Sequence, residues 1–382
     1  MKENPLNSLM NPRSIATVGA GNNPTKMGTI QALSIVKDGY RGKFYPIHPS
    51  EQTVLGHKAY PSVFELPETP DLAIFIVPTD QVIGLMEDFG KIGTRRAVVI
   101  TAGFRETGSA GQELEEQLKE CARRYGIRFL GPNCIGLLNS AISLNVTVMP
   151  LEGPPGLLGM ASQSGTYVTQ TLPYLKKRGI RFSKAISLGN EADIDINDAL
   201  AYLGEDEQTK AIALYIEGLK DPARFLQIAR EITPRKPVIA QYVGGTAAGA
   251  RAGSSHTGAM AGPDHLYDGL FQQAGIIRVY SVEDLYGLGW ALATQPHLKG
   301  KRIGVITNSG GPGTAISDTC NAGGLEVPIF SKRLQEQIRP HIPPHGARAN
   351  PVDLTFFLDI QAISVTIPEL VIQSGEVDGI VL

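Results

Sequence analysis

The 382-residue sequence has little of what marks several common protein classes. Its three cysteines, Cys121, Cys134 and Cys320, are too few and too scattered to indicate a disulfide framework or a zinc site. The formal net charge is only -2, so nothing suggests nucleic acid or an anionic membrane as a partner. No apolar run is long enough to span a bilayer, and no signal peptide is recognisable. We therefore expect a cytoplasmic protein.

What is present is the composition of an ordinary globular protein, with 42% hydrophobic and 19% charged residues. The length predicts two or three domains at roughly 100–200 residues each. Short apolar runs alternate with helical patterns, such as 109–125, along the whole chain. This alternation predicts an α/β fold with parallel sheets covered on both faces. The predicted strands are 14–20, 43–47, 72–77, 97–101, 128–130, 157–161, 184–188, 211–216, 238–242, 276–279, 302–307, 325–329 and 377–382.

Two breaks in this alternation divide the chain into three predicted domains. The Pro- and Gly-rich stretch 149–156 indicates a linker, and a second break falls near 294–301. The chain then stops on the apolar run 377–382 without a closing helix, so we expect the third domain to be incomplete. The expected domains are residues 1–148, residues 157–294 and residues 300–382.

The first predicted strand runs into the loop Gly19-Ala20-Gly21-Asn22-Asn23-Pro24. This loop begins like the dinucleotide fingerprint G-x-G-x-x-G, but Pro24 stands where the third glycine would allow close packing of a helix. The second strand ends at Ile47-His48-Pro49, not at a carboxylate that could hold a ribose hydroxyl. A nicotinamide site is therefore disfavoured. Backbone N–H groups and Lys26 ahead of a helix still suit a nucleotide phosphate, and a plain turn without a ligand is the alternative.

Other predicted strands end in loops of similar character, at Val77-Pro78, Thr101-Ala102-Gly103 and Gly131-Pro132-Asn133-Cys134. In an open parallel sheet, the carboxyl ends of the strands line one crevice where ligands bind. Any one of these loops could be a simple turn. Together, on one edge of a sheet, they predict a binding site.

The segment 244–258 consists mostly of small residues and contains one histidine, His256, and one arginine, Arg251. Small side chains bury little surface, so a loop that presents His256 explains the segment better than core packing does. The imidazole could serve as a general base, a metal ligand or a nucleophile for a phosphoryl group. No second histidine, cysteine or group of carboxylates lies at ligand spacing, so no metal site is predicted.

Two further glycine loops favour phosphate chemistry. Each follows an apolar strand and opens a predicted helix, where backbone N–H groups and the positive helix end can hold a phosphate. Taken singly, such a loop is more often a plain turn, but two of the same design make a phosphate site credible. The predicted phosphate-binding residues are Ser162, Ser164, Gly165, Thr166, Ser309, Gly310 and Gly311.

Five motifs, in the family's order, resemble those of the NDP-forming acyl-CoA synthetases, the group that includes succinyl-CoA synthetase and ADP-forming acetate–CoA ligase. The resemblance covers nearly the whole chain. It implies a Rossmann-like CoA-binding domain followed by two flavodoxin-like ligase domains. The motifs are Ser255-His256-Thr257-Gly258-Ala259-Met260-Ala261-Gly262, Ser162-Gln163-Ser164-Gly165, Tyr215-Ile216-Glu217-Gly218, Gly131-Pro132-Asn133-Cys134 and Asn350-Pro351-Val352-Asp353-Leu354.

The resemblance also implies a reaction. Phosphate attacks a bound acyl-CoA to give an acyl phosphate and CoA, His256 takes the phosphoryl group, and ADP or GDP receives it. In reverse, the same steps make acyl-CoA from a carboxylic acid, CoA and ATP or GTP. Glu217 is expected to accept a hydrogen bond from the second ring nitrogen of His256. The implied CoA-binding residues are Gly19, Ala20, Asn22, Lys26, Gly28, Pro49, Val77, Pro78, Thr101, Ala102, Gly103, Asn133 and Cys134.

No stretch of the chain is a candidate for the ATP-grasp domain that the family uses to bind nucleotide. We expect that domain, with Mg2+ and ADP/ATP or GDP/GTP, to come from a beta-subunit partner or from sequence beyond Leu382. A small carboxylic acid as substrate and a hetero- or homo-oligomeric state follow from the resemblance. Two residues depart from the family pattern: Tyr242 stands where a lysine is frequent, and His48 where an asparagine is more usual.

Two other functions compete with this one. The first is a CoA- or acyl-CoA-sensing protein that kept the fold and lost the chemistry; the presence of His256, Glu217 and Ser164 argues against it. The second is a Rossmann oxidoreductase, which Pro24 and the lack of an acidic ribose partner disfavour.

Overall fold

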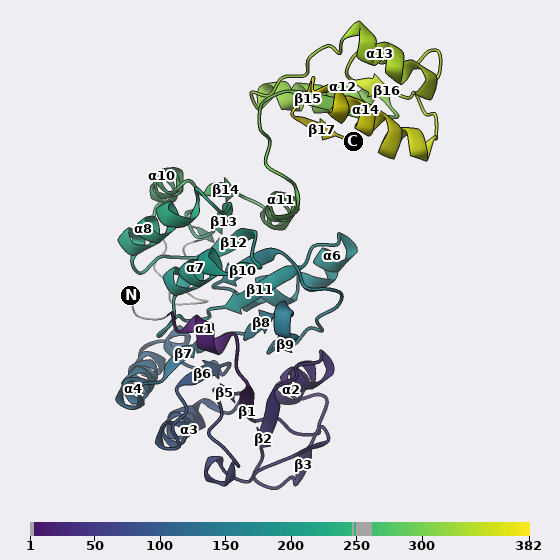
Figure 1. Ribbon diagram of the computed structural model, residues 1–382. Helices are drawn as coiled ribbons and strands as arrows, with labels where there is room; N and C mark the ends of the chain where they lie inside the picture. The colour runs from purple at the N-terminus through teal and green to yellow at the C-terminus, as the bar shows by residue number, and fades with distance from the viewer. Residues whose placement is uncertain (1–3, 247, 250–261) are drawn as a thin grey trace. The chain divides into compact units, whose positions relative to one another are not determined.

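The computed structural model describes residues 4–246, 248–249 and 262–382. The chain divides into two compact units, Met1–Gln295 and Pro296–Leu382 (Figure 1). No helix among the described residues is long and apolar enough to cross a membrane.

The first unit begins with a five-stranded parallel sheet in the order β2-β1-β5-β6-β7. Apolar side chains point alternately to its two faces, so helices cover both. Helix α2 packs on one face, and α3 and α4 pack on the other (Figure 1). The bounds are β1 (Ser14–Val18), α2 (Met27–Lys37), β2 (Lys43–Ile47), β5 (Leu72–Phe75), α3 (Thr79–Lys91), β6 (Arg96–Val99), α4 (Ser109–Tyr125) and β7 (Arg128–Leu130), with a separate antiparallel pair β3 (Thr53–Val54) and β4 (His57–Lys58).

A second, seven-stranded sheet follows in the order β14-β13-β12-β10-β11-β8-β9. The five strands from β14 to β11 are parallel, whereas β8 and β9 pair antiparallel at one edge. Helices α7, α8 and α10 pack on one face, and α5, α6 and α11 on the other. The bounds are β8 (Leu137–Asn139), β9 (Leu144–Asn145), β10 (Leu158–Ser162), α5 (Gly165–Thr169), α6 (Leu172–Lys177), β11 (Phe182–Ser187), α7 (Ile196–Glu205), β12 (Ala211–Ile216), α8 (Pro222–Ile232), β13 (Val238–Tyr242), α10 (Asp264–Ala274), β14 (Ile277–Val279) and α11 (Val282–Thr294).

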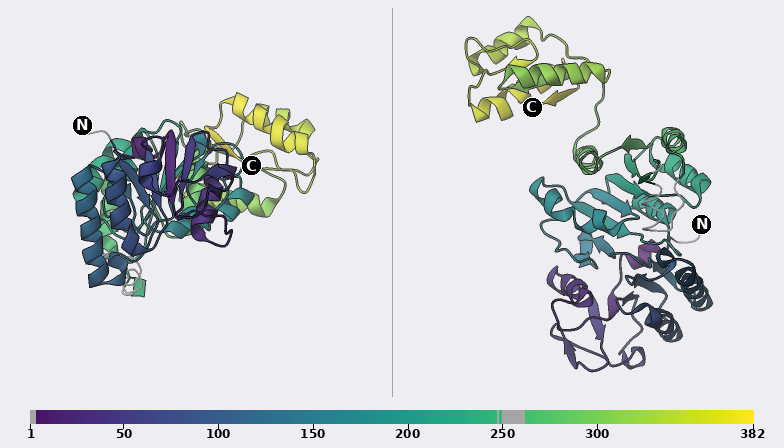
Figure 2. Two further views of the ribbon diagram at one scale, coloured as in Figure 1. Left: turned by 90° about the horizontal axis from the view of Figure 1, so that it is seen from below. Right: turned by 180° about the vertical axis from the view of Figure 1, so that it is seen from behind.

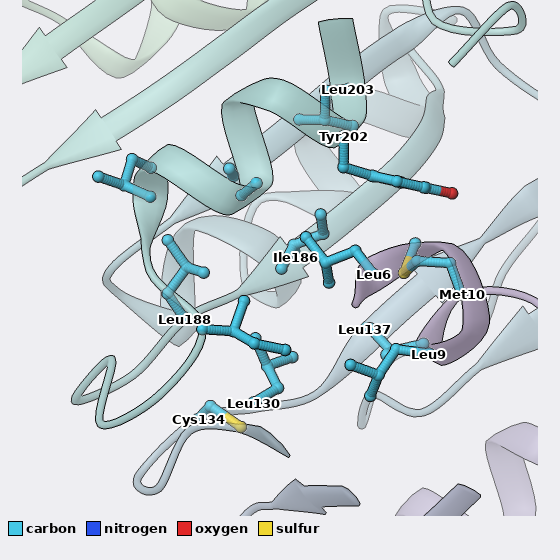
Figure 3. Packing of buried hydrophobic residues seen from close by; sticks show 14 of the residues in the cluster. Leu6, Leu9, Met10, Leu130, Cys134, Leu137, Ile186, Leu188, Tyr202 and Leu203 are labelled. Carbon is cyan, nitrogen blue, oxygen red and sulfur yellow. The ribbon is translucent and has the colours of Figure 1, made fainter. Parts of the chain in front are cut away.

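One continuous hydrophobic core joins the two sheets of the first unit (Figure 3). The short helix α1 (Leu6–Leu9) contributes Leu6 and Leu9, which are fully buried. Leu130 and Cys134 come from the end of the first sheet, and Ile186 comes from the second. Because apolar burial is the dominant favourable term in folding, this shared core fixes the two sheets against each other.

The second unit is a three-stranded parallel sheet in the order β16-β15-β17. Helix α12 packs against one face of β15, and α13 and α14 pack against the other (Figure 2). The bounds are β15 (Ile303–Thr307), α12 (Gly310–Ala322), α13 (Lys332–Ile338), β16 (Val352–Asp353), α14 (Ile367–Ser374) and β17 (Gly379–Val381).

The predicted α/β class with mainly parallel sheets is confirmed, but the strand predicted at 325–329 is wrong. Only Glu326 forms an isolated bridge, to Arg302. Pro328 has no N–H to donate to a ladder, and its carbonyl accepts a hydrogen bond from Asn350 Nδ2 at 2.9 Å instead.

Candidate functional site

The parallel order of the first sheet places the ends of β1, β5, β6 and β7 along one edge. At the end of β1, Gly19 has a φ of 98°, and a Cβ atom there would lie 1.9 Å from the carbonyl oxygen of Ile76. The chain then enters α2, whose N-cap residue Lys26 makes no side-chain cap hydrogen bond. The first N–H groups of α2 and the exposed Lys26 are therefore available to an anion.

The lack of a glycine at position 24 does not keep the helix after β1 from packing closely. Pro24 lies in the turn before α2, and the buried Gly28, in the first turn of the helix, allows the close approach. Gly28 thus allows the close helix packing for which the fingerprint uses its third glycine. Ala20, next to Gly19, is buried in the core.

Asn22, a predicted CoA contact, and His48, a departure from the family pattern, already have protein partners. Asn22 donates from Nδ2 to the carbonyl of Thr53 at 2.8 Å and accepts at Oδ1 from Leu55 N at 2.9 Å. His48 accepts at Nδ1 from Glu51 N at 3.0 Å, while Pro49 is exposed. These side chains shape the turn after β2.

Side-chain hydrogen bonds link the loops that follow β5 and β6. Thr101 Oγ1 donates to the carbonyl of Val77 at 2.7 Å, and Thr79 Oγ1 donates to the carbonyl of Ala102 at 2.7 Å. Pro78 is the N-cap residue of α3, and Gly103 N donates to Glu106 Oε1 at 2.6 Å.

The loop after β7 contacts both of its neighbours. Asn133 N donates to the carbonyl of Thr101 at 2.9 Å, and Asn133 Nδ2 donates to Asn190 Oδ1 at 3.2 Å. Cys134 is buried, and its Sγ lies 3.4 Å from the carbonyl oxygen of Val99. Burial raises the pKa of Cys134 to about 12, so this thiol is protonated at neutral pH and packs in the core.

The first predicted phosphate loop is a tight turn between β10 and α5. Ser162 Oγ donates to the carbonyl of Ser164 at 2.6 Å and accepts from Ser164 N at 3.1 Å. Ser164 Oγ lies 2.9 Å from Thr166 Oγ1 and does not cap the helix. A Cβ atom on Gly165 would lie 3.0 Å from Ile135 Cβ, so the helix begins in close contact with the chain that follows β7.

The second predicted phosphate loop, in the other unit, has the same local geometry. Thr307 Oγ1 donates to the carbonyl of Ser309 at 3.1 Å and accepts from Ser309 N at 3.1 Å. Ser309 is the N-cap residue of α12 and makes no side-chain cap hydrogen bond. Gly310 and Gly311 form the first turn, which leaves the N-terminal N–H groups of a 13-residue helix available.

Glu217 follows β12, the strand beside β10. Its backbone N–H donates to Gln163 Oε1, and so does the N–H of Gly218, at 3.1 Å. Its side-chain Oε2 is buried and has no hydrogen-bond partner among the residues that the structure describes. Burial, followed by the negative charge of Glu217, raises the pKa of Tyr215. The structure thus joins Glu217 to the Ser162–Ser164 turn through Gln163. His256 and Arg251 lie outside the described residues.

Three family models match the sequence: a CoA binding domain at residues 13–140, a succinyl-CoA ligase like flavodoxin domain at residues 155–292 and a ligase-CoA domain at residues 303–371. The chain is 40% identical over 349 residues to the alpha subunit of ADP-forming acetate–CoA ligase II from Pyrococcus furiosus, covering 91% of this chain and 76% of that subunit. The chain belongs to the NDP-forming acyl-CoA synthetase family.

Other members of the family agree with this assignment. The ADP-forming acetate–CoA ligase of Methanocaldococcus jannaschii is 41% identical over 349 residues, and the match covers 91% of this chain but only 49% of that enzyme. A structure of dinucleotide forming acetyl-coenzyme A synthetase 1 from Ca. Korarchaeum cryptofilum, in complex with phosphate and ADP, matches with a TM-score of 0.88 and 34% identity, covering 99% of this chain and 88% of that chain. The chain is thus an acid–CoA ligase component, as its motifs predict.

Tyr242, where members of the acyl-CoA synthetase family often have lysine, has a defined structural place. Its hydroxyl donates to the carbonyl of Gly262 at 2.7 Å, which joins residues on either side of the segment that contains His256. Its ring stacks on Tyr267, with centroids 3.5 Å apart and planes 9° apart. Burial, followed by the neighbouring Tyr267, raises the pKa of Tyr242 to about 12, so it is a neutral hydrogen-bond donor.

Sequence reasoning missed two residues that are hydrogen-bonded next to Glu217 in the candidate site. Gln163 stands inside the Ser162–Gly165 motif but was not assigned a role, and Glu191 follows β11 in Leu188-Gly189-Asn190-Glu191-Ala192. Glu191 Oε2 accepts from Gln163 Nε2 at 2.9 Å. A polar Gly-Asn-Glu sequence directly after a strand is the signal that could have identified Glu191.

Proposed function

We propose that this chain binds CoA and carries a phosphoryl group on His256, within an enzyme that interconverts acyl-CoA, phosphate and ADP or GDP with a carboxylic acid, CoA and ATP or GTP. The observation that supports this most directly is the buried Oε2 of Glu217, which has no partner among the described residues. Leaving a buried polar atom unpaired costs about 1–3 kcal/mol, so the arrangement favours a donor that belongs to the reaction, such as an imidazole N–H.

The roles of the two catalytic residues follow from their chemistry. One ring nitrogen of neutral His256 attacks the phosphorus of an acyl phosphate, the bond from phosphorus to the acyl oxygen breaks, and the carboxylate leaves. The other ring nitrogen keeps its proton and donates a hydrogen bond to Glu217, whose negative charge offsets the positive charge that the ring gains. The phosphoramidate then passes its phosphoryl group to ADP or GDP.

The two turns of equal geometry are the proposed phosphate-binding elements. The first turn consists of Ser162, Ser164, Gly165 and Thr166. The second consists of Ser309, Gly310 and Gly311. Fixed N–H donors of this kind are one of the means by which proteins stabilise the charge of a phosphoryl group in transfer. Helix α5 has five residues and α12 has 13. We therefore expect the N-terminus of α12 to carry the larger positive partial charge and to attract a phosphate more strongly.

The edge of the first sheet fits CoA. The contact of Gly19 with the backbone after β5 leaves no room for a side chain there, and the open N-terminus of α2 with Lys26 suits the phosphates of CoA. When bound, CoA supplies the thiol that carries the acyl group. We propose the CoA-binding domain at residues 1–148 and the ligase domains at residues 157–294 and 300–382.

Nucleotide binding is proposed to need more than these residues. An ATP-grasp domain, as a partner subunit or as a continuation of the chain, would hold ADP or GDP with Mg2+. This chain alone is therefore expected not to turn over. Which small carboxylic acid is used depends on the acyl pocket.

The first experiment is to incubate the chain with acetyl-CoA and a few other acyl-CoAs, phosphate and Mg2+, and to measure intact mass. We expect the gain of one acid-labile, base-stable phosphoryl group, absent from His256→Ala and strongly slowed in Glu217→Gln. If no label forms even after the ATP-grasp partner is added while CoA binds tightly, the sensor function replaces this proposal.

A further inference from the structure

Gln163 connects the ends of three neighbouring strands in the first unit. It follows β10, its backbone N–H donates to the carbonyl of Tyr215 at 3.2 Å, and its side chain is almost fully buried. Its Oε1 accepts from the N–H groups of Glu217 and Gly218. Its Nε2 donates to the carbonyl of Gly218 at 2.8 Å and to Glu191 Oε2 at 2.9 Å. Both polar atoms of the amide are thus engaged.

Glu191 supplies two hydrogen-bond acceptors that this arrangement requires. Its side chain is only 4% exposed. Oε2 accepts from Gln163, as described, and Oε1 accepts from Ile196 N at 2.9 Å at the start of α7. A carboxyl group can accept at both oxygens, whereas an amide of the same shape can accept at only one.

The backbone of Glu191 is held in an unfavourable conformation. Its φ is 54°, in the left-handed region that costs a residue other than glycine of order 1 kcal/mol or more. The neighbouring Asn190 fixes the loop by donating from Nδ2 to Glu106 Oε2 at 2.6 Å and to Glu115 Oε2 at 2.8 Å. Lys220 Nζ donates to the carbonyl of Glu191. A strained backbone conformation that several surrounding hydrogen bonds maintain is typical of functional positions.

We propose that Glu191 is a positioning residue: by orienting the amide of Gln163 it fixes the backbone of Glu217, and so the direction from which the carboxylate meets His256. This inference rests on the proposed role of Glu217. The path runs from Ile196 N through both oxygens of Glu191 and both ends of the Gln163 amide to Glu217 N. Turning over the Gln163 amide would place its oxygen against Glu191 Oε2, an acceptor against an acceptor, so Glu191 favours the orientation in which Oε1 faces Glu217 N.

The test compares Glu191→Gln with the double variant Gln163→Glu, Glu191→Gln. In the single variant one of the two donors, Gln163 Nε2 or Ile196 N, faces an NH2 group. We expect the initial rate of His256 phosphorylation, measured with the nucleotide-binding partner present, to fall about tenfold while CoA affinity stays within about twofold. In the double variant, the new amide at position 191 can donate to the new carboxylate at position 163. That carboxylate still accepts from Glu217 N and Gly218 N but can no longer donate to the carbonyl of Gly218, so only part of the lost rate should return.

Two further measurements separate positioning from stability. Glu191→Gln should slow phosphorylation far less in a Glu217→Gln background, because it acts through Glu217. Asp198→Asn is the matched control: Asp198 is a buried carboxylate of α7 that pairs with Arg224 and not with Gln163. It should lower stability without changing the rate.

Amide hydrogen exchange at 217–218 tests the positioning apart from the chemistry. These N–H groups should exchange faster in Glu191→Gln than in the wild type and in Asp198→Asn. An unchanged exchange rate, no recovery in the double variant, or a full rate loss in the Glu217→Gln background would each overturn the inference. A wild type that takes no phosphate on His256 would instead overturn the proposed function, while the exchange result still decides whether Glu191 orders Gln163.

Discussion

A Cβ atom on Gly28 would lie 2.2 Å from the carbonyl oxygen of Gly19. This contact brings the first turn of α2 against the end of β1, at the edge where CoA is proposed to bind. Both groups in contact are backbone, which cannot swing aside as a side chain can. The pair therefore sets how closely a phosphate can approach the N–H groups of α2.

Gly28→Ala should move α2 away from β1. Overpacking of this kind costs about 1–3 kcal/mol of unfolding free energy, and the dissociation constant of CoA should rise because the helix N-terminus shifts. Denaturant unfolding and calorimetric CoA titration measure the two effects.

Gly84→Ala is the control for this variant. Gly84 lies within α3, and a Cβ atom there would have no heavy atom within 4 Å. Alanine should therefore stabilise α3 by up to about 1 kcal/mol and leave CoA affinity unchanged. Tight CoA binding by Gly28→Ala would contradict the placement of CoA at this edge.

Gly311→Ala separates ligand binding from folding in the second unit. A Cβ atom on Gly311 would meet nothing within 4 Å, although the residue lies in the first turn of α12. The unfolding free energy should be unchanged or rise by up to about 1 kcal/mol. If the phosphoryl group approaches this turn, the added methyl group should slow His256 phosphorylation about 10- to 100-fold by displacing it.

Gly287→Ala serves as the comparison for Gly311→Ala, because it too lies within a helix, α11, with open space around a new Cβ atom. Its phosphorylation rate should equal that of the wild type. Equal rates for all three proteins would show that the N-terminus of α12 does not contact the phosphoryl group.

Long apolar strands and well-bounded helices were predictable from the sequence. The strands predicted at 211–216 and 238–242 coincide with β12 and β13, and the helix predicted at 109–125 coincides with α4. That helix lies between Gly108 and Gly126, whose φ values of 98° and 65° suit glycine and end the helix clearly. Strands β8, β9 and β16 have two or three residues each, too few for a periodic pattern, so only tertiary pairing defines them.

The turns of the candidate site were predictable where glycine-rich loops follow apolar strands. The turns at Ser162 and Ser309 were found in this way. Glu191 was not, because it lies 28 residues from Gln163 and meets it only when β11 and β10 pair side by side. Its local sequence carries no sign of that partner, so the link needs the fold.

Tyr242→Phe should loosen the junction between β13 and Gly262. The phenylalanine ring can still stack on Tyr267, so the change removes the hydrogen bond to the carbonyl of Gly262 and the polar interaction of the hydroxyl with Tyr267. The expected loss of unfolding free energy is about 1 kcal/mol. Tyr280→Phe is the control, since Tyr280 is 71% exposed, and it should cost nothing measurable. Equal stability of both variants would show that the Tyr242 hydroxyl does not fasten this junction.

The stability of the fold should depend on pH through Glu191. Burial raises the pKa of Glu191 from 4.5 to about 7, with Lys220 opposing the shift and Asp195 adding to it. The unfolded chain therefore loses this proton at lower pH than the folded one. The stabilisation is fully present below the unfolded pKa and is lost as pH rises through about 7.

Glu191→Gln removes this titration. The difference in unfolding free energy between wild type and variant should change by roughly 3 kcal/mol between pH 4.5 and 8, in the direction that disfavours the wild type at high pH. Groups that do not interact with Glu191 titrate alike in both proteins and cancel in the difference, which leaves Glu191 together with its coupling to Asp195. Urea unfolding of the two proteins across this range measures the difference, and parallel stability curves would show that folding does not raise the pKa of Glu191.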